Sequence, residues 1–369
     1  MLSAGAFGAS GLARFAAHPV VNLAIAALFL LFALSFLGVI QLRIPTTVVS
    51  RSLAATFTGE RTGSFMMGVL FTLTAFTCTA PFVGTLLVMS SQGNWRWPLI
   101  GMLAFSTAFA MPFFVLAITP TLLRYRPRAG GWLPTLEMIL GGIEIGAAIK
   151  FVSNADLVLG WGVFTRRTVV ALWILILLII ALAVYARTWR LSDRTLTRVR
   201  PNRFSRIALG AIVALVVLLV PALFDRRIGE LDAFLPPLKH GNSVTRREAL
   251  WMLNDYRSAI QAGAREHRPI LVDFTGYTCT NCRWMEANMF PRPEVRRRLD
   301  QFVLVRLYTD GIGEPFLSQQ RLEQTLFRSV ALPLYAVLDP TGRPRSTFLG
   351  MTRDQKDFSE FLDRGAAMR

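Results

Sequence analysis

Two cysteines, Cys279 and Cys282, are separated by two residues and closely follow the apolar run Ile270–Phe274. The run is typical of a buried β-strand, and we expect the dithiol to stand at the start of a helix. The helix dipole and the free backbone N–H groups at a helix N-terminus favour the thiolate of the first cysteine. Two thiols at this spacing can close a small disulfide ring. The pattern therefore indicates dithiol–disulfide chemistry.

An acidic residue, Asp273, lies on the predicted strand six residues before Cys279. A carboxylate beneath the dithiol could accept the proton of Cys282, or return it, during exchange. Asp273 is therefore a candidate catalytic residue.

A zinc site and an inert pair of thiols are the alternatives to redox chemistry. A structural zinc needs four ligands, whereas the chain has 3 Cys and 3 His in total. The histidines, His18, His240 and His267, show no ligand spacing to the dithiol. A purely structural disulfide would close too short a loop to constrain the unfolded chain usefully. We expect no metal and no cofactor besides the redox-active disulfide.

The run Ile270–Phe274 followed by Cys-Thr-Asn-Cys resembles the thioredoxin fold, and Ala331-Leu-Pro333 before an apolar run resembles that fold's cis-proline loop. The resemblance implies that Pro333 lies beside the dithiol, where adjacent backbone can pair with a substrate segment. A proline before a strand is otherwise an ordinary strand opener. Thr278 replaces the usual Trp before the first cysteine, with Tyr277 one place earlier, so we expect a different surface around the dithiol.

Hydrophobic residues make up 53% of the 369-residue chain, and its charges are sparse at first and dense after residue 240. This distribution predicts a membrane portion followed by a soluble one. The formal net charge of +17 could indicate nucleic acid. Much of the arginine falls in short loops between apolar segments, however, so membrane topology explains it better. We expect a lipid bilayer and no nucleic acid as partner.

Six apolar segments are long enough to cross a membrane as helices. They are Val21–Leu42, Phe65–Met89, Pro98–Leu123, Leu133–Val152, Val169–Tyr185 and Ile207–Phe224. The fourth has the weakest hydropathy because it contains Glu137, Glu144 and Lys150. Charges inside a span cost about 2.5–3.5 kcal/mol each, so they should face the bundle or a wet cavity. Glu144 could hydrate a route to the membrane cysteine, although an interfacial position for Glu137 is at least as plausible.

The odd-numbered connections carry most of the loop arginines and are therefore predicted to be cytoplasmic. Both termini, and the dithiol with them, then lie outside, in the periplasm of a bacterium. A dithiol kept reduced in an oxidising compartment needs electrons from across the membrane.

Cys78 lies in the second apolar segment, within the stretch Thr77–Gly84. A lone cysteine in an apolar helix is usually a small buried hydrophobe. Here Pro81 removes a backbone donor and Gly84 allows close approach. We therefore expect a helix broken at mid-membrane, and such a break could expose the thiol to partners from one or both sides. The alternative is an ordinary proline kink, which is common in membrane helices and needs no redox purpose.

The stretch Phe76–Gly84, with Ser91–Asn94 and Lys150–Asp156, resembles the second part of the CcdA-like transmembrane domain of the DsbD family. The resemblance implies a protein-disulfide reductase of the bacterial inner membrane. It would take electrons from cytoplasmic thioredoxin and pass them to periplasmic thiol–disulfide proteins, including those of cytochrome c maturation.

In this family Cys78 would match one of two membrane cysteines, Cys279 the exposed nucleophile and Cys282 the resolving thiol. Glu286, four residues after Cys282, is similar to an acidic residue of the family's C-terminal domain. The alternative interpretation is that Glu286 lies on a solvated face of the helix.

The family's first membrane helix, and the cysteine that this helix carries, have no counterpart in the chain. A single thiol cannot carry two electrons as an intramolecular disulfide. The alternatives are a truncated reading frame, which we favour, a partner thiol on another chain, or a chain without transmembrane transfer. In the last case the helices would serve only as an anchor or assembly module.

The predicted architecture is a polytopic α-helical membrane domain followed by an α/β thioredoxin-like domain. The predicted boundaries are 1–224 for an incomplete membrane domain, 225–244 for a solvated linker and 245–369 for the thioredoxin-like domain. Predicted elements of the last are a helix at Arg246–Glu266, a strand at Phe302–Tyr308, a helix at Glu314–Phe327, strands at Leu334–Leu338 and Ser346–Leu349, and a helix at Asp354–Arg364.

Overall fold

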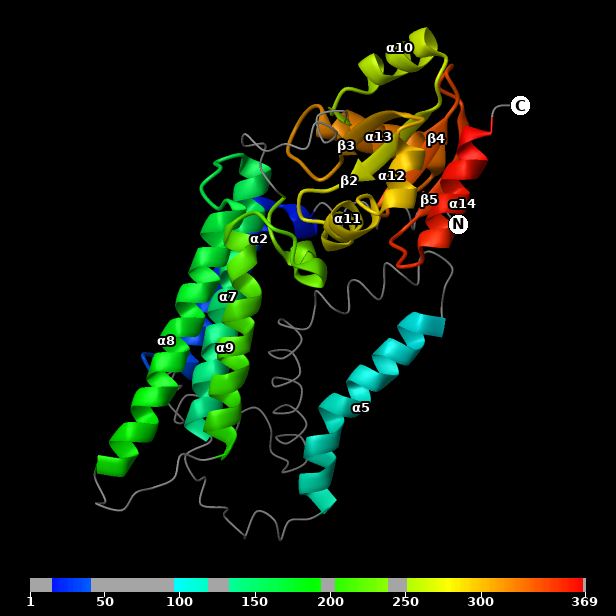
Figure 1. Ribbon diagram of the computed structural model, residues 1–369. Helices are drawn as coiled ribbons and strands as arrows, with labels where there is room; N and C mark the ends of the chain where they lie inside the picture. The colour runs from blue at the N-terminus through cyan, green and yellow to red at the C-terminus, as the bar shows by residue number, and fades with distance from the viewer. Residues whose placement is uncertain (1–14, 41–95, 119–132, 194–202, 238–250, 368–369) are drawn as a thin grey trace. The chain divides into compact units, whose positions relative to one another are not determined.

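The computed structural model describes residues 15–40, 96–118, 133–193, 203–237 and 251–367 (Figure 1). The chain divides into two compact units, one of residues 38–133 and one that combines residues 1–37 with 134–369. Helix α5 (Arg96–Ile118) belongs to the smaller unit. The predicted span Phe65–Met89, with Cys78 and its proline, lies outside the described residues.

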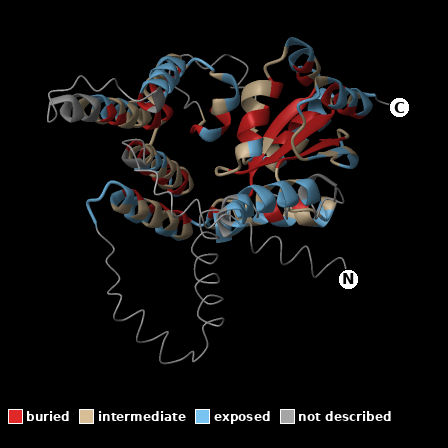
Figure 2. Ribbon diagram, turned by 90° about the horizontal axis from the view of Figure 1, so that it is seen from below, coloured by how far each residue is buried: buried red, intermediate tan, exposed pale blue. Residues whose placement is uncertain are grey.

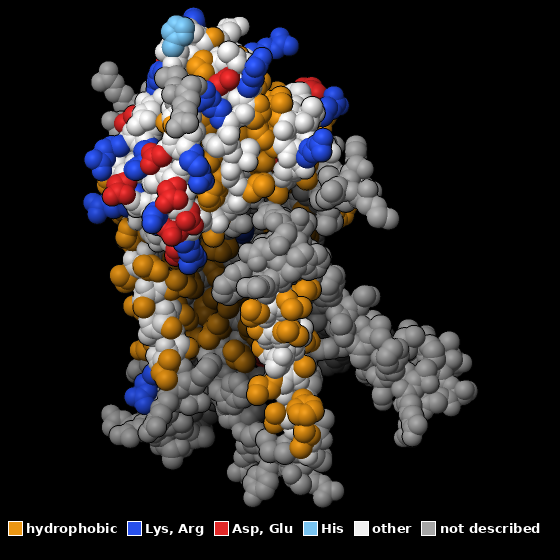
Figure 3. Space-filling view, turned by 90° about the vertical axis from the view of Figure 1, so that its right-hand side faces the viewer, with side chains coloured by type: hydrophobic (Ala, Val, Ile, Leu, Met, Phe, Trp, Pro, Cys, Tyr) orange, Lys and Arg blue, Asp and Glu red, His pale blue; other side chains and the backbone are white. Residues whose placement is uncertain are grey.

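Three helices are long and apolar enough to cross a membrane within the described part of the chain. They are α2 (Pro19–Phe36), α8 (Arg166–Asp193) and α9 (Arg203–Leu223), each of which contains such a stretch. Large apolar side chains such as Leu182, which is 67% exposed, remain uncovered by protein on these helices. Figure 3 shows hydrophobic side chains over the helices and charged ones over the thioredoxin-like part. The predicted membrane portion is confirmed.

Helix α7 (Leu133–Leu159) matches the predicted fourth span and packs closely on α8. A Cβ on Gly142 would lie 1.9 Å from Cδ1 of Ile180, so a larger residue here would require the Ile180 side chain to move. Nearby, Trp173 of α8 donates its indole N–H to the carbonyl of Gly146 (3.1 Å). Small residues at a helix contact are typical of membrane bundles.

A buried polar cluster links the C-terminal part of α7 to α2. Asn154 donates to Oδ1 of Asn22 (3.4 Å), and Asn22 donates to the carbonyl of Ala16 (2.8 Å). Asp156, which is 1% exposed, accepts the backbone N–H groups of residues 163 and 164. These hydrogen bonds satisfy most of the buried polar atoms here, whereas Oδ1 of Asn154 has no hydrogen-bond partner among the described residues.

A 3-10 helix, η1 (Gly229–Phe234), lies inside the predicted linker 225–244 and has contacts on both sides. Its Asp232 forms a buried ion pair with Arg166 at the start of α8. Its Glu230 accepts the indole N–H of Trp284 (2.9 Å) from α11 (Thr280–Trp284). This part of the connection is therefore packed rather than solvated.

The C-terminal part contains a five-stranded sheet of order β1-β3-β2-β4-β5. The strands are β1 (Trp251–Leu253), β2 (Ile270–Thr275), β3 (Val303–Tyr308), β4 (Leu334–Leu338) and β5 (Pro344–Leu349). Strands β1, β3 and β2 are parallel, whereas β4 is antiparallel to β2 and to β5. The remaining helical elements are α10 (Tyr256–Glu266), the π-helix η3 (Met285–Met289), α12 (Pro293–Leu299), α13 (Phe316–Phe327) and α14 (Gln355–Ala366).

The predicted helix Arg246–Glu266 is wrong at residues 251–255, and its residues 246–250 lie outside the described part of the chain. Residues 251–253 form β1, which pairs with β3 from Leu304 to Arg306. Asn254 then takes a left-handed φ of 56°, and the Asp255 side chain caps α10 by accepting the N–H of Ser258 (3.0 Å). An apolar run of three residues fits a strand or a helix, and here pairing with β3 decides between them.

The sheet separates two apolar clusters, and Figure 2 shows its central strands β2, β3 and β4 as buried. Side chains of a strand alternate between faces. Asp273 therefore shares the face of Leu271, which is covered by α11, η3, α12 and α14. The opposite face is covered by α10 and α13. This alternation places a carboxylate beneath the helix that carries the dithiol.

Replacing Phe358 with alanine should destabilise the thioredoxin-like domain by about 3–5 kcal/mol, because the side chain is fully buried among four aromatic rings. Hydrogen exchange of the β4 amides in the full chain would report the loss as faster opening. Leu326→Ala is the control, since that side chain on α13 is 37% exposed. Equal exchange in the two variants would contradict the assigned core.

Candidate active site

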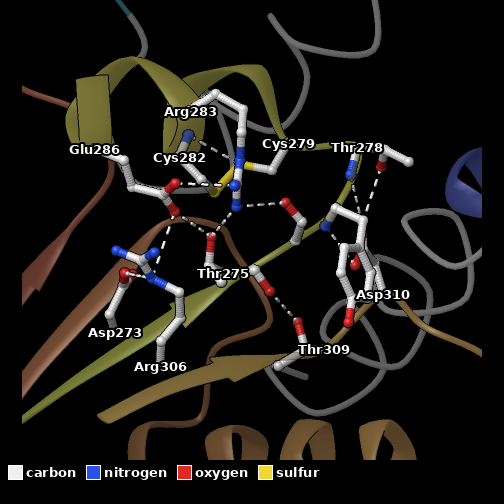
Figure 4. Close-up of a disulfide and its surroundings, with 12 residues drawn as sticks. Asp273, Thr275, Thr278, Cys279, Cys282, Arg283, Glu286, Arg306, Thr309 and Asp310 are labelled. Atoms are coloured by element: carbon white, nitrogen blue, oxygen red, sulfur yellow. Dashed lines mark hydrogen bonds and ion pairs between the residues drawn. A yellow bond between two sulfur atoms is a disulfide. The ribbon is translucent and has the colours of Figure 1, made fainter. Parts of the chain in front are cut away.

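The dithiol stands at the N-terminus of α11, as predicted (Figure 4). Cys279 is the N-cap residue, and its Sγ accepts the backbone N–H of Cys282 (3.1 Å). The two residues form a disulfide, with their Cα atoms 5.3 Å apart. Cys279 is partly exposed, whereas Cys282 is fully buried. A partner disulfide can therefore reach Cys279 first.

Asp310 holds the loop that precedes Cys279. Its carboxylate accepts the backbone N–H groups of Tyr277 (2.7 Å) and Thr278 (2.9 Å), and also the Thr278 hydroxyl (3.0 Å). Burial raises the pKa of Asp310, and these hydrogen bonds oppose the rise. The sequence analysis missed this residue; an Asp-Gly pair just after a strand was the available signal.

Three aromatic rings pack together beside the loop that leads to Cys279. The ring of Tyr277 stacks on Tyr308 with centroids 4.0 Å apart and meets Phe316 edge-on at 5.8 Å. Stacked and edge-on rings each contribute about 0.5–1.5 kcal/mol beyond burial. Together with Asp310, they fix the approach to Cys279.

Two acids and two arginines form a charged layer beneath the disulfide (Figure 4). Arg306 pairs with Asp273 (Nε to Oδ2, 2.9 Å) and lies 3.6 Å from Oε1 of Glu286. Arg283 pairs with Glu286 (Nη1 to Oε2, 2.8 Å) and donates to the hydroxyl of Thr275 (3.2 Å). The alternative of a solvated helix face for Glu286 is wrong, because its side chain is only 14% exposed and paired twice.

The π-helix η3 follows α11 directly and contains Glu286. Phe290 donates its N–H to the carbonyl of Met285 (3.0 Å), an i to i+5 bond. Met285 and Met289 are fully buried in the apolar cluster. Single π-turns inside helices are frequent at functional sites, and this one carries the second acid.

Burial raises the pKa of Asp273 to about 6; the charge of Arg306 opposes the rise, and that of Glu286 adds to it. Its side chain is 1% exposed. A carboxyl group with this pKa can gain and lose a proton near neutral pH. Asp273 therefore suits proton exchange with a buried thiol.

The Leu332–Pro333 peptide is cis and directly precedes β4. The carbonyl of Pro333 accepts the N–H of Gly350 (2.8 Å). A Cβ on Gly276 would lie 3.1 Å from the Leu332 side chain, so this loop abuts the segment that leads to Cys279. The structure thus brings Pro333 to the same end of the sheet as the dithiol.

Of the six predicted site residues, the C-terminal domain contains five and gathers four around the disulfide: Asp273, Cys279, Cys282 and Glu286. Cys78 is outside the described residues. Among the residues that are described, no group of three or more His, Cys, Asp or Glu could hold a metal ion.

A thioredoxin-like domain with a disulfide at a helix N-terminus, joined in one chain to apolar helices long enough to cross a membrane, places the chain in the class of membrane proteins that carry a thioredoxin-like domain. Comparison with known families agrees with this class. Residues 2–155 match the cytochrome c biogenesis protein transmembrane domain, and residues 251–340 match a thioredoxin-like family. These matches confirm the predicted resemblance to the DsbD family.

Curated relatives named thiol:disulfide interchange protein DsbD align with most of the chain. The relative from Vibrio vulnificus is 24% identical over 89% of this chain and 51% of its own length. That from Photorhabdus laumondii is 26% identical over 94% of this chain and 56% of its own. A solved disulphide isomerase from Xylella fastidiosa is 20% identical, with a TM-score of 0.24, over 35% of this chain and 95% of that one. The chain spans about half the length of the curated relatives it matches.

Replacing Asp310 with alanine should release the loop before Cys279, because two backbone N–H groups lose a charged acceptor, at about 1.5–3 kcal/mol per hydrogen bond. Hydrogen exchange at residues 277 and 278 should accelerate. Asp339→Ala is a matched control, since Asp339 likewise accepts the N–H groups of Thr341 and Arg343 in an exposed turn. Unchanged exchange at 277 and 278 in Asp310→Ala would refute the assigned role.

Proposed function

We propose that this chain is a membrane thiol–disulfide reductase that passes electrons from cytoplasmic thioredoxin, through Cys78, to Cys279 and Cys282 and on to periplasmic disulfides. The observation that carries the proposal is the disulfide at the N-terminus of α11, above a buried carboxyl whose pKa is about 6, in a chain with membrane-crossing helices. In this account residues 1–224 conduct electrons across the membrane, residues 225–244 connect the two domains, and residues 245–369 deliver the electrons to the substrate.

The outward reaction begins with the reduced dithiol. The Cys279 thiolate attacks a substrate disulfide, forms a mixed disulfide and releases one substrate thiolate. Cys282 then gives its proton to Asp273 and attacks Sγ of Cys279, which releases the second substrate thiolate. The dithiol loses two electrons, and the substrate disulfide gains them. The buried position of Cys282 and the exposed edge of Cys279 support this order of attack.

Three further residues support the reaction without taking part in the thiol–disulfide exchange. Glu286 shares Arg306 with Asp273 and thereby influences its charge. The backbone beside Pro333 is offered to an incoming extended segment, as the thioredoxin-like family implies. Tyr277 lies one place before Thr278, which stands where the family usually has Trp, and its ring gives the entrance a different surface.

The inward reaction regenerates the dithiol. We place the C-terminal domain in the periplasm of a bacterial inner-membrane protein, because arginine-rich connections mark the opposite side. Cys78 would receive electrons from thioredoxin and reduce the Cys279–Cys282 disulfide. A single thiol cannot do this alone, so the relay requires a second membrane thiol on a preceding segment or on another chain.

A second candidate function is a thioredoxin-like reductase whose helices act only as an anchor or assembly module. The observation that favours it is the cysteine count, since only Cys78 remains beyond the outer dithiol. In that case another protein would reduce Cys279 and Cys282.

The redox state of the outer dithiol in cells separates the two functions. With a preceding membrane segment of a relative fused in frame, thiol trapping should find Cys279 and Cys282 reduced, and Cys78→Ala should leave them oxidised. Cys78 is the donor thiol in this account, so its loss blocks electron flow but not the fold of the C-terminal domain.

Cys279→Ala in the same fusion is the control for trapping specificity. Equal reduction of the dithiol with and without Cys78 would contradict the relay and favour the anchor.

A further inference from the structure

Arg306 is the side chain that joins the two buried acids. It lies on β3 directly beside Asp273 of β2 in the sheet register. Its Nε is 2.9 Å from Oδ2 of Asp273 and 3.6 Å from Oε1 of Glu286. The side chain is 14% exposed. One guanidinium therefore serves two carboxylates that would otherwise repel each other.

An aromatic ring fixes the position of this guanidinium. The Cζ atom of Arg306 lies 4.6 Å from the centroid of Trp251 on the adjacent strand β1. A guanidinium over an indole face gains about 0.5–2 kcal/mol, more as water is excluded. Arg306 is thus held between a ring on one strand and a carboxylate on the other.

The two oxygens of Asp273 differ in their contacts. Oδ2 accepts the Nε–H of Arg306, whereas Oδ1 has no hydrogen-bond partner among the described residues. The hydroxyl of Tyr335, which faces Asp273 from β4, is likewise buried without a partner. A buried carboxylate oxygen without a donor is costly in the ionised form, and protonation of that oxygen relieves the cost.

The other charged and titratable groups that influence Asp273 come from the helices and strands packed around it. They are Glu286 of η3, Arg283 of α11, Arg306 of β3 and Tyr335 of β4. When Asp273 itself is counted, two carboxylic acids face two arginines. Loss of one arginine leaves an excess of buried negative charge, and loss of Glu286 leaves an excess of positive charge.

We propose that Arg306 is a positioning residue for the reductase reaction: it occupies Oδ2 of Asp273, leaves Oδ1 to take the proton of Cys282, and keeps Asp273 ionised beside Glu286. The inference rests on the proposed reductase function. When Cys282 attacks Sγ of Cys279, its proton moves to Oδ1 of Asp273, the bond from Cys279 to the substrate sulfur breaks, and the Cys279–Cys282 bond forms. The substrate sulfur leaves as a thiolate with the electron pair.

The attack of Cys282 on Sγ of Cys279 becomes fast above a certain pH. This role predicts that removing the charge of Arg306 and removing the charge of Glu286 shift that pH in opposite directions. The attack needs ionised Asp273, so its rate rises with pH through the pKa of that group. Arg306→Gln removes a favourable charge, which raises the pKa and moves the rise to higher pH by about one to three units. Glu286→Gln removes a like charge and moves the rise to lower pH.

The test uses the full chain in detergent, with Cys78→Ala as background so that only Cys279 and Cys282 react. The dithiol is reduced chemically and mixed with an aromatic disulfide reagent that releases one coloured thiolate per step. The second release reports the attack by Cys282, and its rate is followed from about pH 5 to 9. This range is wide enough to include the shifted pKa values expected for a buried carboxyl group. Arg306→Lys, which keeps the charge, should keep the midpoint near that of the parent.

Arg298→Gln is the matched control, because Arg298 also pairs with a carboxylate, that of Asp363, but on the exposed side of α12 and α14. Its profile should superimpose on that of the parent. Superimposable profiles for Arg306→Gln would overturn the proposal, as would a shift of Glu286→Gln in the same direction as Arg306→Gln. If Arg306→Gln does not fold, Glu286→Gln and Arg306→Lys carry the test.

The assay supplies electrons chemically, so a failed relay through Cys78 leaves its outcome unchanged. A parent protein that releases no second thiolate would instead contradict the reductase function itself.

Discussion

The burial of Asp273 inside the sheet is the constraint on which the rest of the site depends. A carboxylate that is 1% exposed cannot remain ionised in an apolar core without compensating charge. Arg306 supplies that charge, Trp251 holds Arg306, and the π-turn η3 brings Glu286 to the same guanidinium. The strand, the edge ring and the irregular helix thus position one buried carboxyl group beneath the disulfide.

The same domain keeps the reactive sulfur at its surface. Asp310 and the ring of Tyr277 fix the loop before Cys279, while the buried Met285 secures the helix after it. The 3-10 helix η1 contacts this helix through Glu230. These contacts preorganise the segments on both sides of the accessible sulfur, as functional sites need.

Sequence reasoning located the dithiol, the acid beneath it and most strands because each depends on local pattern: an apolar run, a cysteine spacing and an alternation of faces. It missed β1 because Trp251–Leu253 gains its structure from pairing with β3. It also missed Arg306 and Asp310, since both act on residues more than thirty positions earlier. Such contacts arise only when the sheet register is known, and no periodicity in the chain encodes them.

Electron flow through the membrane is the central claim, and a trapped intermediate tests it most directly. In Cys282→Ala without a second membrane thiol, Cys78 can attack the mixed disulfide that Cys279 forms with a substrate, which releases the substrate thiolate and forms a Cys78–Cys279 disulfide. No thiol remains to resolve this disulfide, so it should accumulate. Mass spectrometry of digested membranes should then find the peptide of Cys78 joined to that of Cys279, and reductant should separate them. If the joined peptide never forms while Cys279 still forms disulfides with other proteins, electrons do not pass from Cys78, and the account is contradicted.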